Sequence, residues 1–198
     1  MPKGVVVLAS GQGTLLQALL DSPVKQELLA VGSDLTDCGA LSRAEAAAVP
    51  TFCVALVPGM DRAQWDEALA AELHRWDPEW IVCAGFMRIL GEQVLEAFPQ
   101  RIINSHPALL PAFPGAHAVR DALTYGAKVT GTTVHLVDAG VDTGPIIAQQ
   151  PVTVQIDDDE SSLHERIKEV ERVLLVDVVQ QVLTHGLKLE NRRVIVGG

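Results

Sequence analysis

Hydrophobic residues in the first half of the chain gather in short runs separated by amphipathic stretches. The runs are rich in β-branched residues, which is typical of strands buried on both faces of a sheet. The predicted strands are Val5–Ala9, Leu28–Ser33, Thr51–Ala55, Trp80–Ala84 and Ile102–Ser105.

Helix-like spacing fills the gaps between these runs. The predicted helices are Gly13–Asp21, Leu41–Val49 and Arg62–Trp76. In the last of them Trp65, Leu69, Leu73 and Trp76 recur at helical spacing. Parallel strands need crossover connections, so this alternation predicts an α/β protein with a Rossmann-like, doubly wound, mostly parallel sheet and helices on both faces.

The second half of the chain is less regular. Strand runs Gly131–Val137 and Pro145–Val154 flank a turn-rich segment, Asp138–Gly144. A long helix begins near Ser161 and ends before Gly186, and Leu187–Val196 is predicted to form a hairpin. The chain has no internal repeat and no linker-like stretch, so we expect residues 1–198 to form a single domain.

Composition and charge exclude several functions. Among 198 residues 48% are hydrophobic and 20% charged, which excludes a disordered chain. The formal charge is 15 − 25 = −10, and no cluster of Lys and Arg offers a basic face. We therefore expect no nucleic-acid partner, since binding to phosphates requires such a face.

The cysteines and the apolar runs indicate the cellular compartment of the protein. Cys38, Cys53 and Cys83 are an odd number in separate segments without metal-ligand spacing, so neither a disulfide framework nor a metal site is expected. For Cys83, inert packing is favoured over reactivity. Val5–Ala9 is too short for a signal-peptide core, and no run reaches the roughly 18 apolar residues of a membrane span. These features predict a cytoplasmic protein without a membrane partner.

The turn after the first strand, Ser10–Thr14, could bind an anion, since its glycines expose backbone N–H groups. A tight turn that merely packs is the alternative. A dinucleotide fingerprint would need glycine where Leu16 stands, although Asp34 lies where a ribose-binding acid would, so a nicotinamide-dependent dehydrogenase stays open.

The segment Asn104–Gly115 carries the densest chemical signal. Asn104 and His106 alternate with Ser105 at the carboxyl end of a buried strand, so their side chains should point to one side. An amide N–H and an imidazole placed together can stabilise an oxyanion or move a proton. No serine or cysteine nucleophile is evident, which places the nucleophile on the substrate.

Two acids follow in the loop Asp138–Gly144. Asp138 and Asp142 could be solvated turn residues. Alternatively, a carboxylate near the imidazole would orient it and favour its charged form.

Four segments in order give the chain a resemblance to the phosphoribosylglycinamide formyltransferases, the glycinamide ribonucleotide transformylases of the formyltransferase superfamily. They are Ser10–Thr14, Ala84–Leu90, Ile103–Gly115 and Gly131–Ile147. The resemblance implies a Rossmann-like fold and formyl transfer from 10-formyltetrahydrofolate to glycinamide ribonucleotide in purine biosynthesis, without a metal. It places a catalytic triad on Asn104, His106 and Asp142.

The same resemblance implies which residues bind the two substrates. The phosphate loop and ribonucleotide contacts fall on Gly11, Gln12, Gly13, Thr14, Leu15 and Glu171. The folate contacts fall on Arg62, Met87, Arg88, Ile89, Leu90, Asn104, Asp138, Ala139, Gly140, Val141 and Asp142. Leu15 departs from the asparagine common in the family, which puts one polar substrate contact in doubt.

The chain length leads us to expect a protein distinct from other members of the superfamily. Methionyl-tRNA formyltransferases carry an additional C-terminal domain, formyltetrahydrofolate deformylases carry an N-terminal one, and sugar-nucleotide formyltransferases usually belong to longer chains. The remaining alternatives are the nicotinamide dehydrogenase and a non-catalytic nucleotide-binding module. The expected partners are small molecules, and a homodimer is compatible with the sequence.

Overall fold

The computed structural model describes residues 4–197 and divides the chain into two compact units, residues 1–103 and 104–198. The boundary lies inside strand β5, so no linker separates the units. The prediction that residues 1–198 form one domain stays a prediction.

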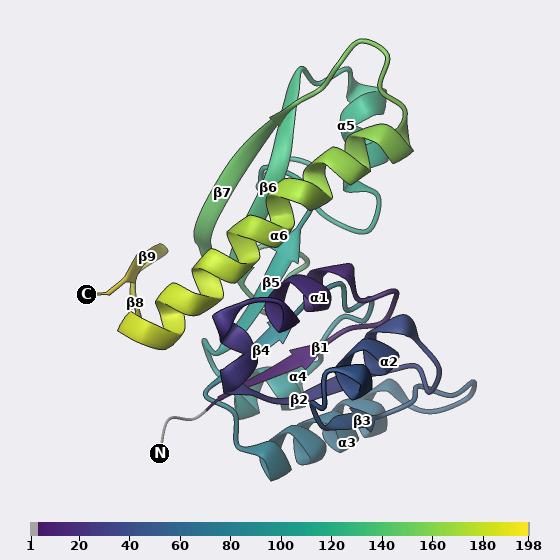
Figure 1. Cartoon of the computed structure of the whole chain (residues 1–198), viewed down its shortest axis with the longest axis vertical. Coiled ribbons are helices and arrows are strands. Elements are labelled where there is room, and N and C mark those ends of the chain that lie inside the picture. Colours follow the sequence, from purple (N-terminus) through teal and green to yellow (C-terminus); the bar gives the residue numbers. More distant parts are fainter. Residues whose placement is uncertain (1–3, 198) are drawn as a thin grey trace. The chain divides into compact units, whose positions relative to one another are not determined.

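The first unit alternates strands and helices, as Figure 1 shows. Its elements are β1 (Val5–Leu8), α1 (Thr14–Leu20), the 3₁₀ helix η1 (Pro23–Glu27), β2 (Leu28–Ser33), α2 (Gly39–Ala46), β3 (Thr51–Cys53), α3 (Arg62–Trp76), β4 (Trp80–Cys83), α4 (Glu92–Ala97) and the start of β5 (Ile102–His106). The second unit continues with α5 (Ala118–Tyr125), β6 (Val129–Leu136), β7 (Ile146–Thr153), α6 (Glu160–His185), β8 (Leu187–Glu190) and β9 (Arg193–Val196).

The main sheet has the strand order β3-β2-β1-β4-β5-β6-β7, which confirms the predicted Rossmann-like class. Strands β1, β2, β3 and β4 pair in parallel, whereas β6 and β7 pair antiparallel. The strand order reverses between β1 and β4. Helix α1 packs on α2 and α3 packs on α4, as right-handed crossovers on the two sides of such a switch point require. Ligands of open α/β sheets bind at the carboxyl ends of strands beside this point.

Burial explains why these runs form the centre of the sheet. Every residue of β1 and β4 is buried, and α3 buries Trp65, Leu69 and Leu73. Strand β3 was predicted to be buried on both faces, and that was wrong. It lies at the sheet edge, where Thr51 and Phe52 are half-buried and Cys53 is exposed.

The sequence also misjudged some helices. Helix α2 begins at Gly39 and ends at Ala46, before the predicted limit at Val49, because Ala48 adopts a left-handed φ of 60°. Helices α4 and α5 were not predicted. The N–H groups of Gly91 and Val94 at the start of α4 donate to the buried Asp66 carboxylate of α3. A cap from a distant helix leaves no local sequence signal.

Candidate active site

His106 and Asp142 lie close together in the second unit. Asn104 and His106 end strand β5, and Asp142 lies in the loop between β6 and β7. His106 Nδ1 is 3.3 Å from Asp142 Oδ2, and the His106 ring is almost fully buried. The predicted alternation is confirmed, because Ser105 instead donates to Glu171 of α6 at 2.7 Å.

The groups around His106 affect its pKa in opposite directions. Its Nε2 is 2.8 Å from the Phe113 carbonyl, which can only accept, so Nε2 carries a hydrogen. Burial lowers the pKa of His106 below its ordinary value, although Asp142 and the Phe113 carbonyl both act to raise it. An oxygen bound by this ring would compete with the Phe113 carbonyl for the Nε2 hydrogen.

Asp142 is held as a carboxylate. Burial alone would raise its pKa, but His135, the Gly115 N–H and His106 together lower it below its usual range. Gly115 N donates to Asp142 Oδ2 at 2.8 Å. The residue adopts a φ of 53°, a left-handed conformation that is uncommon for residues with a Cβ but that aspartate adopts more readily than most.

The loop around Asp142 is folded on itself. Asp138 Oδ1 accepts hydrogen bonds from the Gly140 N–H at 3.2 Å and from the Thr143 hydroxyl at 2.6 Å. A Cβ on Gly140 would lie 2.0 Å from Thr143 Oγ1, and one on Gly144 would lie 1.7 Å from the Leu136 carbonyl oxygen. Only glycine fits at position 144, because the near atom is backbone, whereas a Cβ at position 140 would displace the Thr143 side chain. Asp138 therefore shapes the loop, while Ala139 and Val141 are exposed on it.

His135 of β6 also belongs to this cluster. Its Nδ1 is 2.8 Å from the Leu136 carbonyl and so carries a hydrogen, which leaves Nε2 of the neutral ring as an acceptor. Asn104 Nδ2 lies 3.2 Å from that nitrogen, and Asp142 Oδ1 lies 3.6 Å from it. His135 thus orients the Asn104 amide. The only sequence signal for His135 is its place in the segment Gly131–Ile147, one of the four on which the resemblance depends.

The loop that follows His106 contains Pro107, Pro111 and Pro114, which restrict its backbone, and hydrogen bonds fix it further. The Thr133 hydroxyl of β6 donates to the Ala108 carbonyl at 2.6 Å and accepts from the Leu110 N–H at 3.0 Å. Gln149 of β7 donates to the Leu110 carbonyl at 2.9 Å. The loop is therefore tied to two strands of its own unit, which holds the Phe113 carbonyl beside His106.

Glu171, expected to contact the ribonucleotide, is buried on α6. Burial raises its pKa, and the hydrogen bond from Ser105 partly counters this. One of its oxygens is already engaged by Ser105.

The predicted phosphate loop lies in the first unit and is braced by α2. Gly13 has a φ of 72°, and a Cβ there would lie 2.7 Å from Ala40 Cα. Ala40 N donates to the Gly11 carbonyl at 3.0 Å, and Arg43 Nε donates to the Gln12 carbonyl at 2.8 Å. Sequence reasoning missed Arg43, because its contact with the loop is made only in the folded protein.

Two further predictions can be placed at this loop. Thr14 begins helix α1, and Gln12 is exposed. The Leu15 side chain is buried, so a contact with a ligand would have to come from its backbone.

Asp34 is committed to an internal network. Its carboxylate accepts from the Ser10 hydroxyl at 2.5 Å and from Arg88 Nε at 2.6 Å, and Ser10 Oγ also accepts from the Met87 N–H. Both carboxylate oxygens thus have partners. This arrangement disfavours the dehydrogenase alternative, in which Asp34 would bind a ribose, and it joins the loop after β1 to the segment after β4.

That segment holds the first group of predicted folate residues. Met87 and Ile89 expose 69% and 65% of their surface, whereas Leu90 is buried. Arg62 Nη2 donates to the Ile89 carbonyl at 2.5 Å. The structure therefore brings Arg62 next to the Met87–Leu90 segment in the first unit, while the predicted folate residues Asn104 and Asp138–Asp142 belong to the second.

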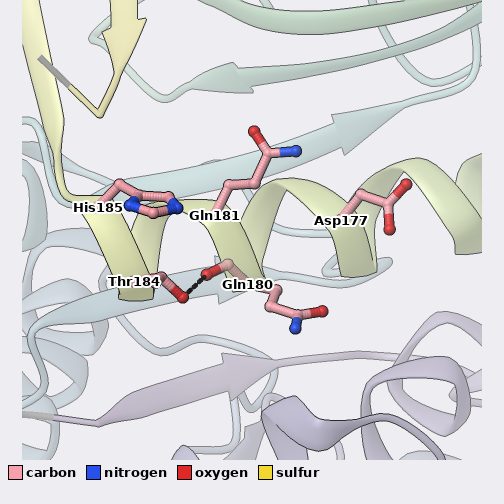
Figure 2. Close-up of a pocket in the computed structure, with 5 residues that line it drawn as sticks. All are labelled: Asp177, Gln180, Gln181, Thr184 and His185. Atoms are coloured by element: carbon pink, nitrogen blue, oxygen red, sulfur yellow. Dashed lines mark hydrogen bonds between the residues drawn. The ribbon is translucent and has the colours of Figure 1, made fainter.

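Other candidate features carry no predicted role. A hollow of about 330 Å³ on α6 is lined by Asp177, Gln180, Gln181, Thr184 and His185 (Figure 2), none of them a predicted site residue. Burial raises the pKa of Cys83 to about 12, which disfavours a thiolate nucleophile. Within residues 4–197 no group of three or more His, Cys, Asp and Glu side chains could hold a metal ion, and no helix is long and apolar enough to cross a bilayer.

The fold and the cluster together define a class of protein. An amide, an imidazole and a carboxylate gather at a strand end and its neighbouring loop in a Rossmann-like α/β protein. These groups suit an enzyme that transfers an acyl-type group through an oxyanion.

The chain belongs to the formyl transferase family, which matches residues 3–179. It is 54% identical to a phosphoribosylglycinamide formyltransferase of Mycobacterium tuberculosis, over 99% of this chain and 92% of the relative. Its structure resembles that of glycinamide ribonucleotide transformylase 1 from Symbiobacterium toebii, with a TM-score of 0.93, 40% identity and coverage of 98% and 93%. A formyltetrahydrofolate deformylase from Pseudomonas syringae gives a TM-score of 0.90 at 26% identity, covering 99% of this chain and 66% of the other.

Proposed function

We propose that this protein transfers the formyl group of 10-formyltetrahydrofolate to the amine of glycinamide ribonucleotide in purine biosynthesis. The observation that carries this proposal is the pairing of His106 with Asp142 in a formyl transferase chain. The likeness to a transformylase and to a formyltetrahydrofolate deformylase supports a formyl-folate donor.

The reaction needs no covalent enzyme intermediate. The substrate amine attacks the formyl carbon, and the carbonyl oxygen becomes an oxyanion. Asn104 offers the amide hydrogen that His135 does not take, and His106 offers a ring hydrogen. The carbon–nitrogen bond to folate then breaks, and the proton lost by the amine passes by way of water to the folate nitrogen. An oxyanion donor of this kind contributes about 10²–10³ in rate.

Asp142 supports His106 in this scheme. Its carboxylate, 3.3 Å from the ring, stabilises the imidazolium against burial. We assign the Gly11–Leu15 loop and Glu171 to the ribonucleotide. We assign Arg62, Met87–Leu90 and Asp138–Asp142 to folate. A cytoplasmic location and a homodimer stay predictions.

The test is a product assay with purified protein, glycinamide ribonucleotide and 10-formyltetrahydrofolate, run with and without the ribonucleotide. We expect tetrahydrofolate to form only when the amine is present. His106→Ala should lose about 10²–10⁴ in turnover, because the oxyanion loses the ring hydrogen and the site loses the group that Asp142 stabilises as a cation. His117→Ala, an exposed histidine before α5, should retain wild-type turnover.

Two results would overturn this proposal. Folate product formed without the amine would identify a formyl-folate hydrolase. Ribonucleotide binding without turnover would identify a binding module.

A further inference from the structure

The tip of the C-terminal hairpin touches the loop that carries Asp142. Strands β8 and β9 pair antiparallel and are joined through Asn191 and Arg192. Strand β9 packs against β7 and α6 in the same unit, and Figure 1 shows the hairpin beside the C-terminal end of α6. From this position Arg192 Nη2 donates to the Thr143 carbonyl oxygen at 2.6 Å.

Thr143 is the point through which Asp142 can be held. It follows Asp142 directly, and its hydroxyl already donates to Asp138. Thr143 is therefore held on two sides, its hydroxyl by Asp138 of the same loop and its carbonyl by Arg192 of the hairpin. An arginine is suited to this contact because its guanidinium is always charged and presents several N–H donors.

The position of Asp142 depends on several contacts. Its left-handed φ of 53° is uncommon for a residue with a Cβ, although aspartate tolerates it better than most, so the contacts around it help to keep this conformation. Its Oδ2 must also accept the Gly115 N–H while lying 3.3 Å from His106. A small relaxation of the backbone at Thr143 would change both of these distances.

We propose that Arg192 is a positioning residue, which holds the Asp138–Gly144 loop through the Thr143 carbonyl and so keeps the Asp142 carboxylate against His106. This inference rests on the proposed function only where it concerns turnover. The hairpin lies beyond the residues matched to the formyl transferase family, which end at 179. The loop would thus depend on a part of the chain that the family match does not include.

The neighbouring residue provides a matched control. Arg193 is also exposed and carries the same charge, and within residues 4–197 its side chain makes no hydrogen bond or ion pair. Arg192→Gln and Arg193→Gln therefore change net charge equally, whereas only the first removes the guanidinium from Thr143. Arg192→Lys retains a charged donor.

The experiment combines turnover with a direct titration of His106 by NMR, its signal assigned by loss in His106→Ala. For Arg192→Gln we expect turnover to fall about threefold to tenfold, the effect of one lost hydrogen bond. The pKa of His106 should move further toward acid, because Asp142 raises it in the intact site. Arg193→Gln should match wild type in both measurements, and Arg192→Lys should recover part of each.

The outcomes separate this inference from the proposed function. Identical turnover and an identical His106 titration in Arg192→Gln and Arg193→Gln would overturn the positioning role. A wild-type protein that formylates nothing would overturn the proposed function, while the NMR titration would still test Arg192. A thermal melt of each variant checks folding, and a lower melting temperature without a shifted His106 titration would contradict the inference as well.

Discussion

At the scale of single residues, the chemistry of the cluster depends on which groups are committed before substrate arrives. His106 has an acceptor at each ring nitrogen, the Phe113 carbonyl at Nε2 and Asp142 at Nδ1. That geometry suits an imidazolium, because only the cation has a hydrogen on both nitrogens. Burial opposes it and prevails, so the pKa of His106 lies below its ordinary value. The ring is therefore set to take up charge when negative charge develops nearby.

The first prediction concerns the two loop acids. Asp142→Asn keeps the shape of the side chain but removes the anion that raises the pKa of His106, so the His106 titration should move toward acid. Turnover should fall with smaller changes in substrate binding, because the lost interaction strengthens as the ring becomes charged. The measurement is turnover against pH together with the histidine NMR signal.

Asp138→Asn is the natural comparison. An amide oxygen can still accept from the Gly140 N–H and the Thr143 hydroxyl, so this variant should keep most of its turnover and an unshifted profile. If Asp138→Asn instead gives the large loss while Asp142→Asn behaves as wild type, the two roles are reversed.

At the scale of elements, local pattern predicted the buried strands well, since β1, β2 and β4 are apolar runs with turn residues around them. It failed where a distant residue decides the outcome. The N-terminus of helix α4 is capped by the Asp66 carboxylate of α3, which accepts from the Gly91 N–H. Strand β3 is half-exposed because the strand order places it at the sheet edge. Pattern gives no access to either fact.

The candidate site shows the same division. Asn104 and His106 could be found because they share one strand end, where alternation fixes their direction. His135 and Arg43 could not, since a buried histidine in a strand and an arginine on a helix are ordinary until their partners are known. Asp142 was placed by resemblance, and the roles of all these residues stay predictions.

The second prediction concerns the glycine loop after β1. Gly13→Val forces a branched side chain into a left-handed position and against Ala40, so the loop must shift. The Michaelis constant of the Gly13→Val variant for the ribonucleotide should rise far more than its Michaelis constant for formyl-folate. Steady-state kinetics with each substrate varied in turn measures this directly.

Gly11→Ala tests direct contact between the loop and the ribonucleotide without changing the loop geometry. A Cβ at Gly11 has no heavy atom within 4 Å in the folded chain, so stability should be unchanged. A raised Michaelis constant for the ribonucleotide in this variant would then come from the ligand itself. Equal effects on both substrates, or none on either, would reject the loop as the phosphate site.

At the scale of the whole molecule, the two compact units are joined in an unusual place. The boundary falls between Ile103 and Asn104, in the middle of strand β5. If the second unit unfolded alone, strand β5 would have to be disrupted in its middle, while its first residues, Ile102 and Ile103, stayed buried in the first unit. Inter-domain boundaries ordinarily fall in exposed linkers with few contacts. We therefore expect residues 1–198 to unfold as one cooperative unit, which is what a single domain would do.

The third prediction tests this coupling across the boundary. All three tryptophans, Trp65, Trp76 and Trp80, lie in the first unit, so their fluorescence reports that unit alone. Leu163→Ala opens a cavity in the second unit, where Leu163 is fully buried with Val119, Val152 and Ile167, and should cost about 2–5 kcal/mol. If the chain unfolds as one, tryptophan fluorescence and far-UV circular dichroism should shift to the same lower urea midpoint, because a two-state transition has no separate stages. Val173→Ala, on the exposed face of the same helix, should leave both curves near wild type. A tryptophan curve that stays at the wild-type midpoint in Leu163→Ala, while circular dichroism gains an earlier step, would instead show two domains that fold separately.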